Sequence, residues 1–335
     1  MKKILFSLIV SFLLCVSNNV LAIQTLPKLF LFVGSDANLR SYEKILLNPC
    51  ITGIQAIYTW KELEPKKGIY NFSRIERDLG FLNSIHKKLF IQLQDRSFQP
   101  NIFNVPDYIR KEKIYHNGVA MQYDFPGEGI PITEGWVARV WDPAVRERFQ
   151  LLIQKLATQF DGKIYGINLP ETATDFNSKN PPKDFTQDRY FNAELENINA
   201  LRSAFTKSIV LQYVNFFPGE WNNDHKYMSR LFSYAIQHRV GLGGPDIVPY
   251  RKAQMKNSYP FFHQKKNKLN NIGMAVQEGE YTYKKTDNTY YNFSDFYLFA
   301  KDYLGATIIF WNTKEPFFSK ELLPKINDQY FDCGK

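Results

Sequence analysis

Short apolar and β-branched runs recur along the chain, and each is followed by a stretch with helical spacing. Eight runs stand out, at 29–33, 54–59, 89–93, 164–168, 209–213, 240–243, 273–276 and 307–310. Runs of this length, bounded by turn residues and alternating with helices, are typical of buried parallel strands. Eight such units predict an α/β fold, a (β/α)₈ barrel closed as one domain.

The stretches between the runs support helices. Ser73 and Glu76 have the spacing of a capping box, and the helix after them would place apolar residues on one face at Ile75, Leu79, Leu82 and Ile85. Asp142 followed by Pro143 predicts a second helix start, continued by Val145, Phe149, Leu152, Leu156 and Phe160. Similar spacing recurs at 195–205 and 228–236.

One connection is unusually long. Residues 95–141 follow the third run and are rich in aromatic side chains. Long loops in compact domains usually serve function. Because this segment follows a strand, we expect it to lie over the C-terminal mouth of the barrel and to wall a groove, with most of its rings packed internally.

The N-terminus predicts export. Lys2 and Lys3 precede an apolar stretch at 4–16 and a polar segment ending at Ala22, the layout of a cleaved signal peptide over 1–22. A spanning helix is the alternative, but the apolar stretch is shorter than the roughly twenty residues that crossing a membrane needs. Residues 23–335 would then form the mature domain, secreted or periplasmic, with no stable membrane insertion.

The charge, the cysteines and the histidines of the chain limit which kinds of ligand and compartment we expect. The net charge of +9 falls to +7 when Lys2 and Lys3 are removed, and the remaining basic residues are scattered, which argues against a nucleic-acid track. Cys50 and Cys333 could form a disulfide in an oxidising compartment or remain two thiols. The five histidines lack metal-ligand spacing and no phosphate-binding glycine motif is present, so we expect neither metal nor cofactor.

Two glutamates follow predicted strands. Glu171 comes after the fourth run and Glu278 after the seventh. Strand ends of a barrel converge on its axis, and glycosidic bond cleavage needs one carboxylic acid and one carboxylate at the same bond. Glu280 and Asp246, which follow the seventh and sixth runs, are the alternative partners of Glu171.

A second feature is the motif that follows the second run. It consists of Trp60, Glu64-Pro65, Gly68 and Phe72. With Val105-Pro106, the segment 140–145 and Trp311, it resembles clan A glycoside hydrolases over most of the mature chain. The resemblance implies a retaining (β/α)₈ enzyme with Glu171 as acid/base, Glu278 as nucleophile and Trp311 as the floor of a sugar subsite. One departure is that Asn168 stands three residues before Glu171 instead of directly before it.

The sequence thus predicts an exported glycoside hydrolase that cleaves a β-linked oligo- or polysaccharide by retention. A non-catalytic carbohydrate-binding barrel and a surface adhesion protein are the alternatives. Side chains expected to bind substrate are Trp60, Asp95, Arg96, Asn168, Tyr213, Asn215, Asp246, Glu280, Trp311 and Asn312.

Overall fold

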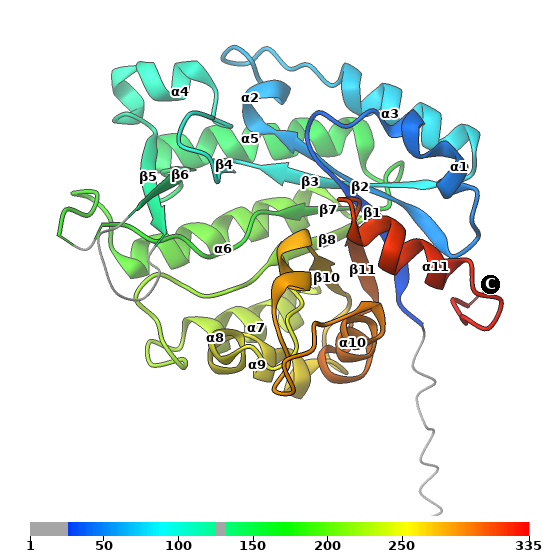
Figure 1. Cartoon of the computed structure of the whole chain (residues 1–335). Coiled ribbons are helices and arrows are strands. Elements are labelled where there is room, and N and C mark those ends of the chain that lie inside the picture. The colour runs from blue at the N-terminus through cyan, green and yellow to red at the C-terminus, as the bar shows by residue number, and fades with distance from the viewer. Residues whose placement is uncertain (1–25, 125–131, 178, 335) are drawn as a thin grey trace, which may run out of the picture.

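The strands of the chain close into a parallel barrel (Figure 1). The computed structural model describes residues 26–124, 132–177 and 179–334. The barrel order is β1-β11-β10-β9-β8-β7-β3-β2, and β11 pairs with β1 to close it. The strands are β1 (Lys28–Val33), β2 (Ile51–Thr59), β3 (Lys88–Gln94), β7 (Gly166–Leu169), β8 (Ile209–Tyr213), β9 (Gly241–Gly244), β10 (Ile272–Val276) and β11 (Ile308–Asn312). Each of the eight predicted runs is a strand, and the predicted (β/α)₈ fold is confirmed.

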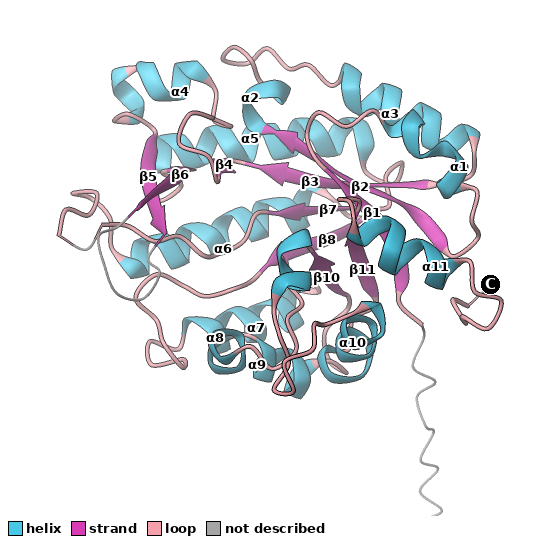
Figure 2. Cartoon of the chain, in the orientation of Figure 1, coloured by secondary structure: helices cyan, strands magenta, loops and turns pink. Residues whose placement is uncertain are grey.

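Helices surround the barrel (Figure 2). Those between the strands or after the last strand are η1 (Leu39–Tyr42), α1 (Glu43–Leu46), α2 (Trp60–Leu63), α3 (Ser73–Ser84), α5 (Pro143–Phe160), α6 (Gln187–Ala204), α7 (Tyr227–His238), α8 (Lys252–Asn257), α9 (Tyr259–Lys265), η3 (Glu278–Thr282), α10 (Phe293–Leu298), η4 (Phe299–Leu304), η5 (Phe318–Leu322) and α11 (Leu323–Ile326). None of the helices in the described ranges is long and apolar enough to cross a membrane.

Both predicted helices form, but only one of the two predicted N-terminal caps is confirmed. The Asp142 carboxylate accepts a hydrogen bond from the Ala144 amide at 2.8 Å and caps α5. The capping box at Ser73 is wrong, because Phe72 is the residue that precedes α3. The Asn71 side chain accepts hydrogen bonds from both the amide and the hydroxyl of Ser73, so Ser73 is engaged in the preceding turn.

The barrel interior has an apolar part and a polar part. Rings of Phe30, Phe90 and Phe310 pack together, with Phe90 and Phe310 centroids 4.8 Å apart. Nearer the C-terminal strand ends, the Gln55 amide donates to Asn168 Oδ1 at 2.9 Å and to the Tyr213 hydroxyl at 2.8 Å. The floor under the C-terminal mouth is therefore hydrogen-bonded and polar.

The long connection after β3 forms a small antiparallel sheet in the order β4-β6-β5. Its elements are β4 (Arg96–Ser97), α4 (Asp107–Lys111), η2 (Lys113–Tyr115), β5 (Val119–Asp124) and β6 (Ile132–Ala138). The Tyr123 amide donates to the Asp175 carbonyl at 2.9 Å, which ties this sheet to the connection after β7. In Figure 1 the small sheet lies beyond the C-terminal ends of β3 and β7.

A disulfide joins Cys50 to Cys333, with Cα atoms 5.4 Å apart. Of the two states that the sequence left open, the structure has the bridged one. It links the start of β2 to the C-terminal tail. The predicted signal peptide over 1–22 lies outside the described residues and stays a prediction.

Candidate active site

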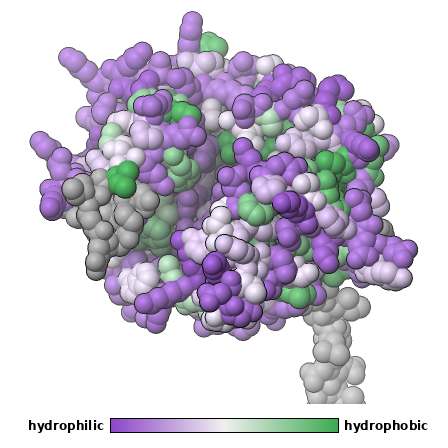
Figure 3. Space-filling view, in the orientation of Figure 1, coloured by the Kyte–Doolittle hydropathy of each residue, from purple (hydrophilic) through white to green (hydrophobic). Residues whose placement is uncertain are grey.

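Glu171 stands at the C-terminal mouth, two residues beyond the end of β7. Its side chain is partly exposed, and Oε2 accepts a hydrogen bond from Asn215 Nδ2 at 3.2 Å. The following residue fixes the loop, because the Thr172 hydroxyl donates to the Phe216 carbonyl at 2.8 Å. Figure 3 shows that this face is hollowed where Figure 1 draws the C-terminal ends of β3 and β7.

The environment of Glu171 raises the pKa of its carboxyl group toward neutral pH. Burial, together with the negative charge of Asp246, raises the pKa of Glu171 to about 7. The Arg96 guanidinium and the Asn215 hydrogen bond act in the opposite direction and are the weaker influences. A carboxylic acid that holds its proton to this pH can serve as a general acid.

Asp246 and Glu280 form a carboxyl pair near Glu171. Asp246 follows β9 and is partly exposed, whereas Glu280 lies in η3 with only 3% of its surface exposed. The two side chains are hydrogen-bonded to each other. Burial raises the pKa of both groups. The charge of Asp246 adds to this rise and holds the pKa of Glu280 well above its usual range, while the hydrogen bond with Glu280 offsets part of the rise in the pKa of Asp246. Glu280 is therefore the protonated member of the pair and Asp246 the carboxylate.

Glu278, the predicted nucleophile, does not take the buried position that follows the seventh strand. Its side chain is exposed at the first residue of η3. The carboxylates whose charges act on Glu171 are Asp246 and Glu134. The strand ends at Val276 and a 3₁₀ turn follows, so Glu278 and Glu280 do not alternate as strand residues would. The turn brings the Glu280 carboxylate back to the Gln277 amide, and the inward place at the end of the seventh strand goes to Glu280.

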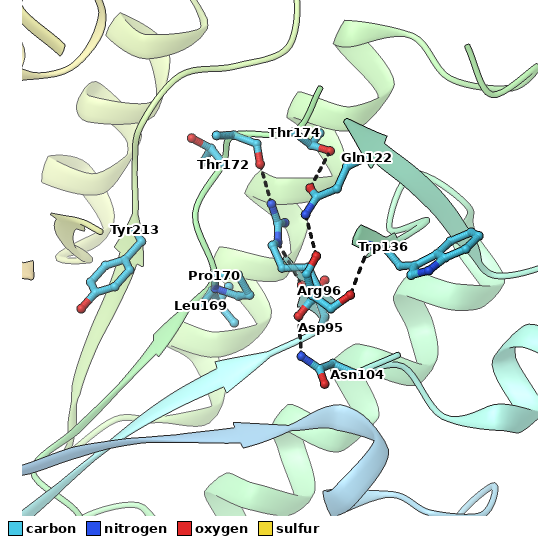
Figure 4. Close-up of polar contacts among 12 residues, drawn as sticks. Asp95, Arg96, Asn104, Gln122, Trp136, Leu169, Pro170, Thr172, Thr174 and Tyr213 are labelled. Carbon is cyan, nitrogen blue, oxygen red and sulfur yellow. Dashed lines mark hydrogen bonds and ion pairs between the residues drawn. The ribbon is translucent and has the colours of Figure 1, made fainter. Parts of the chain in front are cut away.

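Asp95 and Arg96 are buried instead of lining the mouth. Their exposed fractions are 2% and 1%, so the prediction that they contact substrate is wrong for this conformation. Figure 4 shows the Arg96 side chain pointing toward the backbone of residues 172–174. Arg96 Nη1 donates to the Ala173 carbonyl at 2.7 Å, and Nε donates to Asp95 Oδ1 at 3.3 Å. Arg96 thus holds the segment that carries Glu171.

Two further side chains in this cluster escaped the sequence analysis. Tyr190 and Glu194 on α6 are buried against Arg96, and burial raises the pKa of Glu194 to about 7. A signal was present, because Glu194 stands on the apolar face of a helix, four residues after Tyr190 and four before Ile198. Glu134 on β6, whose charge acts on Glu171, gave no comparable signal.

Trp311 does not floor a sugar subsite. Along β11, Ile308 and Phe310 face the barrel interior, so strand alternation turns Trp311 outward to the helices. Its ring stacks on Phe293 with centroids 4.4 Å apart, and Nε1 donates to the Tyr281 hydroxyl at 3.0 Å. Only 1% of its surface is exposed.

Trp60 is buried as well, in an arrangement that we call the Glu64 latch. The Glu64 carboxylate accepts hydrogen bonds from Trp60 Nε1 at 2.9 Å, from the Gly68 amide at 2.9 Å and from Arg148. Gly68 has φ +73°, a conformation that favours glycine. The motif that carries the family resemblance is therefore a structural device, and Trp60 is not a substrate ligand.

The remaining predicted ligands divide between the floor and the mouth. Asn168, Tyr213 and Asn312 are buried in the barrel interior below the carboxylates. Asn312 Oδ1 accepts from the Lys314 amide at 3.0 Å, and its Nδ2 has no hydrogen-bond partner among the described residues. Asn215 and Asp246 are thus the predicted ligands that stay partly exposed beside Glu171.

A separate cavity of about 740 Å³ lies beside the small sheet. Residues from β5 and the connection after β7 line it, including Met121, Tyr123, Phe176 and Asp184. Glu171, Asp246 and Glu280 are not among its lining residues. Over the ranges that the structure describes, no group of three or more His, Cys, Asp or Glu side chains could hold a metal ion.

Comparison with solved structures identifies the fold. The chain is similar to the catalytic domain of a β-amylase from Paenibacillus polymyxa, with a TM-score of 0.55, 8% identity, and coverage of 86% of this chain and 92% of that one. It is similar to a family 39 glycoside hydrolase from Bacteroides cellulosilyticus, with a TM-score of 0.53 and 11% identity over 86% of this chain and 56% of that one. For endo-glycoceramidase II from Rhodococcus sp. the TM-score is 0.52 at 10% identity, over 87% and 74% of the two chains.

Neither a protein-family model nor a curated protein sequence matches the chain. Identities of 8–11% carry information about the fold alone. The chain thus has the (β/α)₈ barrel fold that clan A glycoside hydrolases share.

Proposed function

We propose that the chain is a glycoside hydrolase that cleaves a β-linked oligo- or polysaccharide by retention. One observation carries the proposal: at the C-terminal end of the barrel, Glu171 lies close enough to Asp246 for the charge of Asp246 to raise its pKa, and Asp246 is hydrogen-bonded to Glu280. Glu171 and Asp246 are both partly exposed there. An acid and a carboxylate that reach one bond are what glycosidic cleavage requires.

In this proposal Glu171 donates its proton to the glycosidic oxygen as the bond to the anomeric carbon breaks. A carboxylate of the Asp246–Glu280 pair attacks that carbon from the opposite side. Glu171 then acts as a base toward the water that releases the sugar. Asn215 holds Glu171 in place through its hydrogen bond to Oε2.

The experiment is an activity screen with the oxidised mature chain on β-linked aryl glycosides and polysaccharides. We expect the wild type to release reducing sugar and Glu171→Gln to release almost none. NMR of the first product should show the β anomer, as retention requires. Sugar binding by calorimetry without turnover on any substrate would favour the non-catalytic carbohydrate-binding barrel, and absence of both would favour an adhesion role.

We also propose that the chain is exported. The predicted signal peptide at 1–22 and the Cys50–Cys333 disulfide support this, because disulfides persist in oxidising compartments. Expression with the leader in a bacterial host, followed by N-terminal sequencing, should give a mature chain that begins near Ile23. A chain retained in the cytoplasm with its leader intact would contradict export.

A further inference from the structure

The structure assigns the second catalytic role to Asp246, at the end of the sixth strand of the barrel, and makes Glu280 at the end of the seventh the residue that positions it. This inference rests on the proposed glycoside hydrolysis. It departs from the resemblance to clan A, which places the attacking carboxylate after the seventh strand.

Exposure separates the two carboxyl groups. Asp246 is partly exposed at the mouth, whereas 3% of the Glu280 surface is exposed. A group that attacks an anomeric carbon must touch the sugar. Asp246 is the more exposed of the two groups and is therefore the better placed to make that contact.

The hydrogen bonds of Glu280 indicate that its role is to position Asp246. Its carboxyl accepts from the Gln277 amide and is hydrogen-bonded to Asp246. The Gln277 side chain in turn donates to the Pro245 carbonyl at 3.0 Å, one residue before Asp246. Residues 277–280 therefore bind both the backbone of Pro245 and the side chain of Asp246.

The backbone around Asp246 is held from the other side by Tyr259. The Tyr259 hydroxyl donates to the Asp246 carbonyl at 3.3 Å and accepts from the Val248 amide at 2.9 Å. The carboxylate is thus presented by a fixed loop, as a reacting group should be. The positive charge of Arg251 offsets part of the rise that burial causes in the pKa of Asp246.

In the first step, an oxygen of ionised Asp246 forms an ester bond with the anomeric carbon. The glycosidic C–O bond breaks, and the leaving oxygen takes its electron pair and the proton of Glu171. In the second step, water attacks the same carbon, gives a proton to Glu171, and the ester bond breaks to return the Asp246 carboxylate. The Glu280 proton stays in its hydrogen bond to the other Asp246 oxygen throughout.

A mechanism-based label locates the reacting carboxylate directly. The wild type would be incubated with a 2-deoxy-2-fluoro-β-glycoside that bears a dinitrophenyl leaving group, using the sugar that the activity screen identifies. Peptide mapping by mass spectrometry should place the fluoroglycosyl ester on Asp246. An ester on Glu280 or Glu278, or an inverted product in the NMR assay, would overturn the assignment.

Three variants give an independent readout. Asp246→Ala should lose at least about 10⁴-fold in kcat, and azide should restore turnover with an α-glycosyl azide as product. Glu280→Gln can still donate a hydrogen bond to Asp246, so we expect kcat within about tenfold of wild type. Because an amide is a weaker donor than a carboxylic acid, the pKa of Asp246 should rise, and the acidic limb of the pH profile should move to higher pH. Glu278→Gln, an exposed control, should match wild type.

Azide rescue of Glu280→Ala but not of Asp246→Ala would also overturn the inference. An unmoved acidic limb in Glu280→Gln would contradict the positioning role. Thermal unfolding of each variant separates a loss of fold from a loss of chemistry. If the wild type hydrolyses no glycan, the proposed function fails first; if it does and Asp246→Asn keeps full activity, only the present assignment fails.

Discussion

Glu64 and Glu171 both follow barrel strands, yet they differ in exposure and in the number of hydrogen bonds that their carboxyl groups accept. Glu64 has no exposed surface and accepts hydrogen bonds from Trp60, Gly68 and Arg148. Glu171 is partly exposed and accepts one hydrogen bond, from Asn215, within the described parts of the chain. Glu64 thus has three hydrogen-bond donors around its carboxylate, whereas Glu171 has one among the residues that the structure describes.

This difference in hydrogen-bond donors distinguishes a structural carboxylate from a candidate catalytic one. A buried charge that is paired and hydrogen-bonded holds its neighbours in place. A carboxyl that is desolvated without enough donors keeps its proton, and burial accordingly raises the pKa of Glu171 to about 7. Position after a strand does not distinguish the two groups; their partners do.

The largest expected effect is on catalysis at Glu171. Glu171→Gln keeps the shape and the Asn215 contact but removes the transferable proton, so kcat should fall by about 10³-fold or more on substrates with poor leaving groups. The thermal midpoint should not fall. Steady-state kinetics and calorimetry on the same preparation test this, and undiminished kcat would remove Glu171 from the mechanism.

The opposite outcome is expected for the Glu64 latch. Glu64→Gln leaves Arg148 without its carboxylate partner, which should lower the free energy of unfolding by about 3 kcal/mol. Activity per folded molecule should remain near wild type. Urea unfolding followed by tryptophan fluorescence measures the stability, and a variant as stable as wild type would show that the latch contributes little.

A smaller effect tests the single donor to Glu171. Activity that needs protonated Glu171 should be lost as pH rises through about 7, because the pKa of Glu171 lies near that value. The Asn215 bond lowers this pKa, so Asn215→Ala should raise it and move the alkaline limb upward, by at most about one unit. A limb that stays in place or moves downward in kcat/KM profiles would contradict this reading.

An effect on stability of similar size is expected at Trp60. Trp60→Phe keeps most of the packing against Phe149 and removes one of the three donors to Glu64. Loss of one hydrogen bond to a charged group should cost about 1.5–3 kcal/mol less any relaxation, so we expect about 1.5 kcal/mol in urea unfolding. A large drop in kcat at full stability would instead give Trp60 a role at the mouth.

The sequence was sufficient for the barrel because its signal is local. Each strand is a short buried run, such as 209–213, which coincides with β8. The helices carry apolar residues at helical spacing, as Val145 and Phe149 do on α5. Both patterns follow from burial and period, and neither needs knowledge of distant contacts.

The site was less predictable because its geometry depends on where strands stop and which way they face. Trp311 was assigned to the mouth by resemblance, although alternation with Phe310 turns it outward. Glu278 was preferred over Glu280, but the turn that begins at Glu278 buries Glu280 instead. Glu171, Asp246 and Asn215 lie together in the structure because they follow barrel strands, and the C-terminal ends of these strands converge.

The disulfide makes the folded chain a covalent ring from Cys50 to Cys333, a separation of 283 residues. A protease that cuts once anywhere inside that ring, for example in the long connection after β3, would leave one molecule of unchanged mass apart from one added water. The two pieces would separate on a gel only after reduction. A barrel closed by this disulfide can be cut in its exposed loops and still keep both halves of its mouth together.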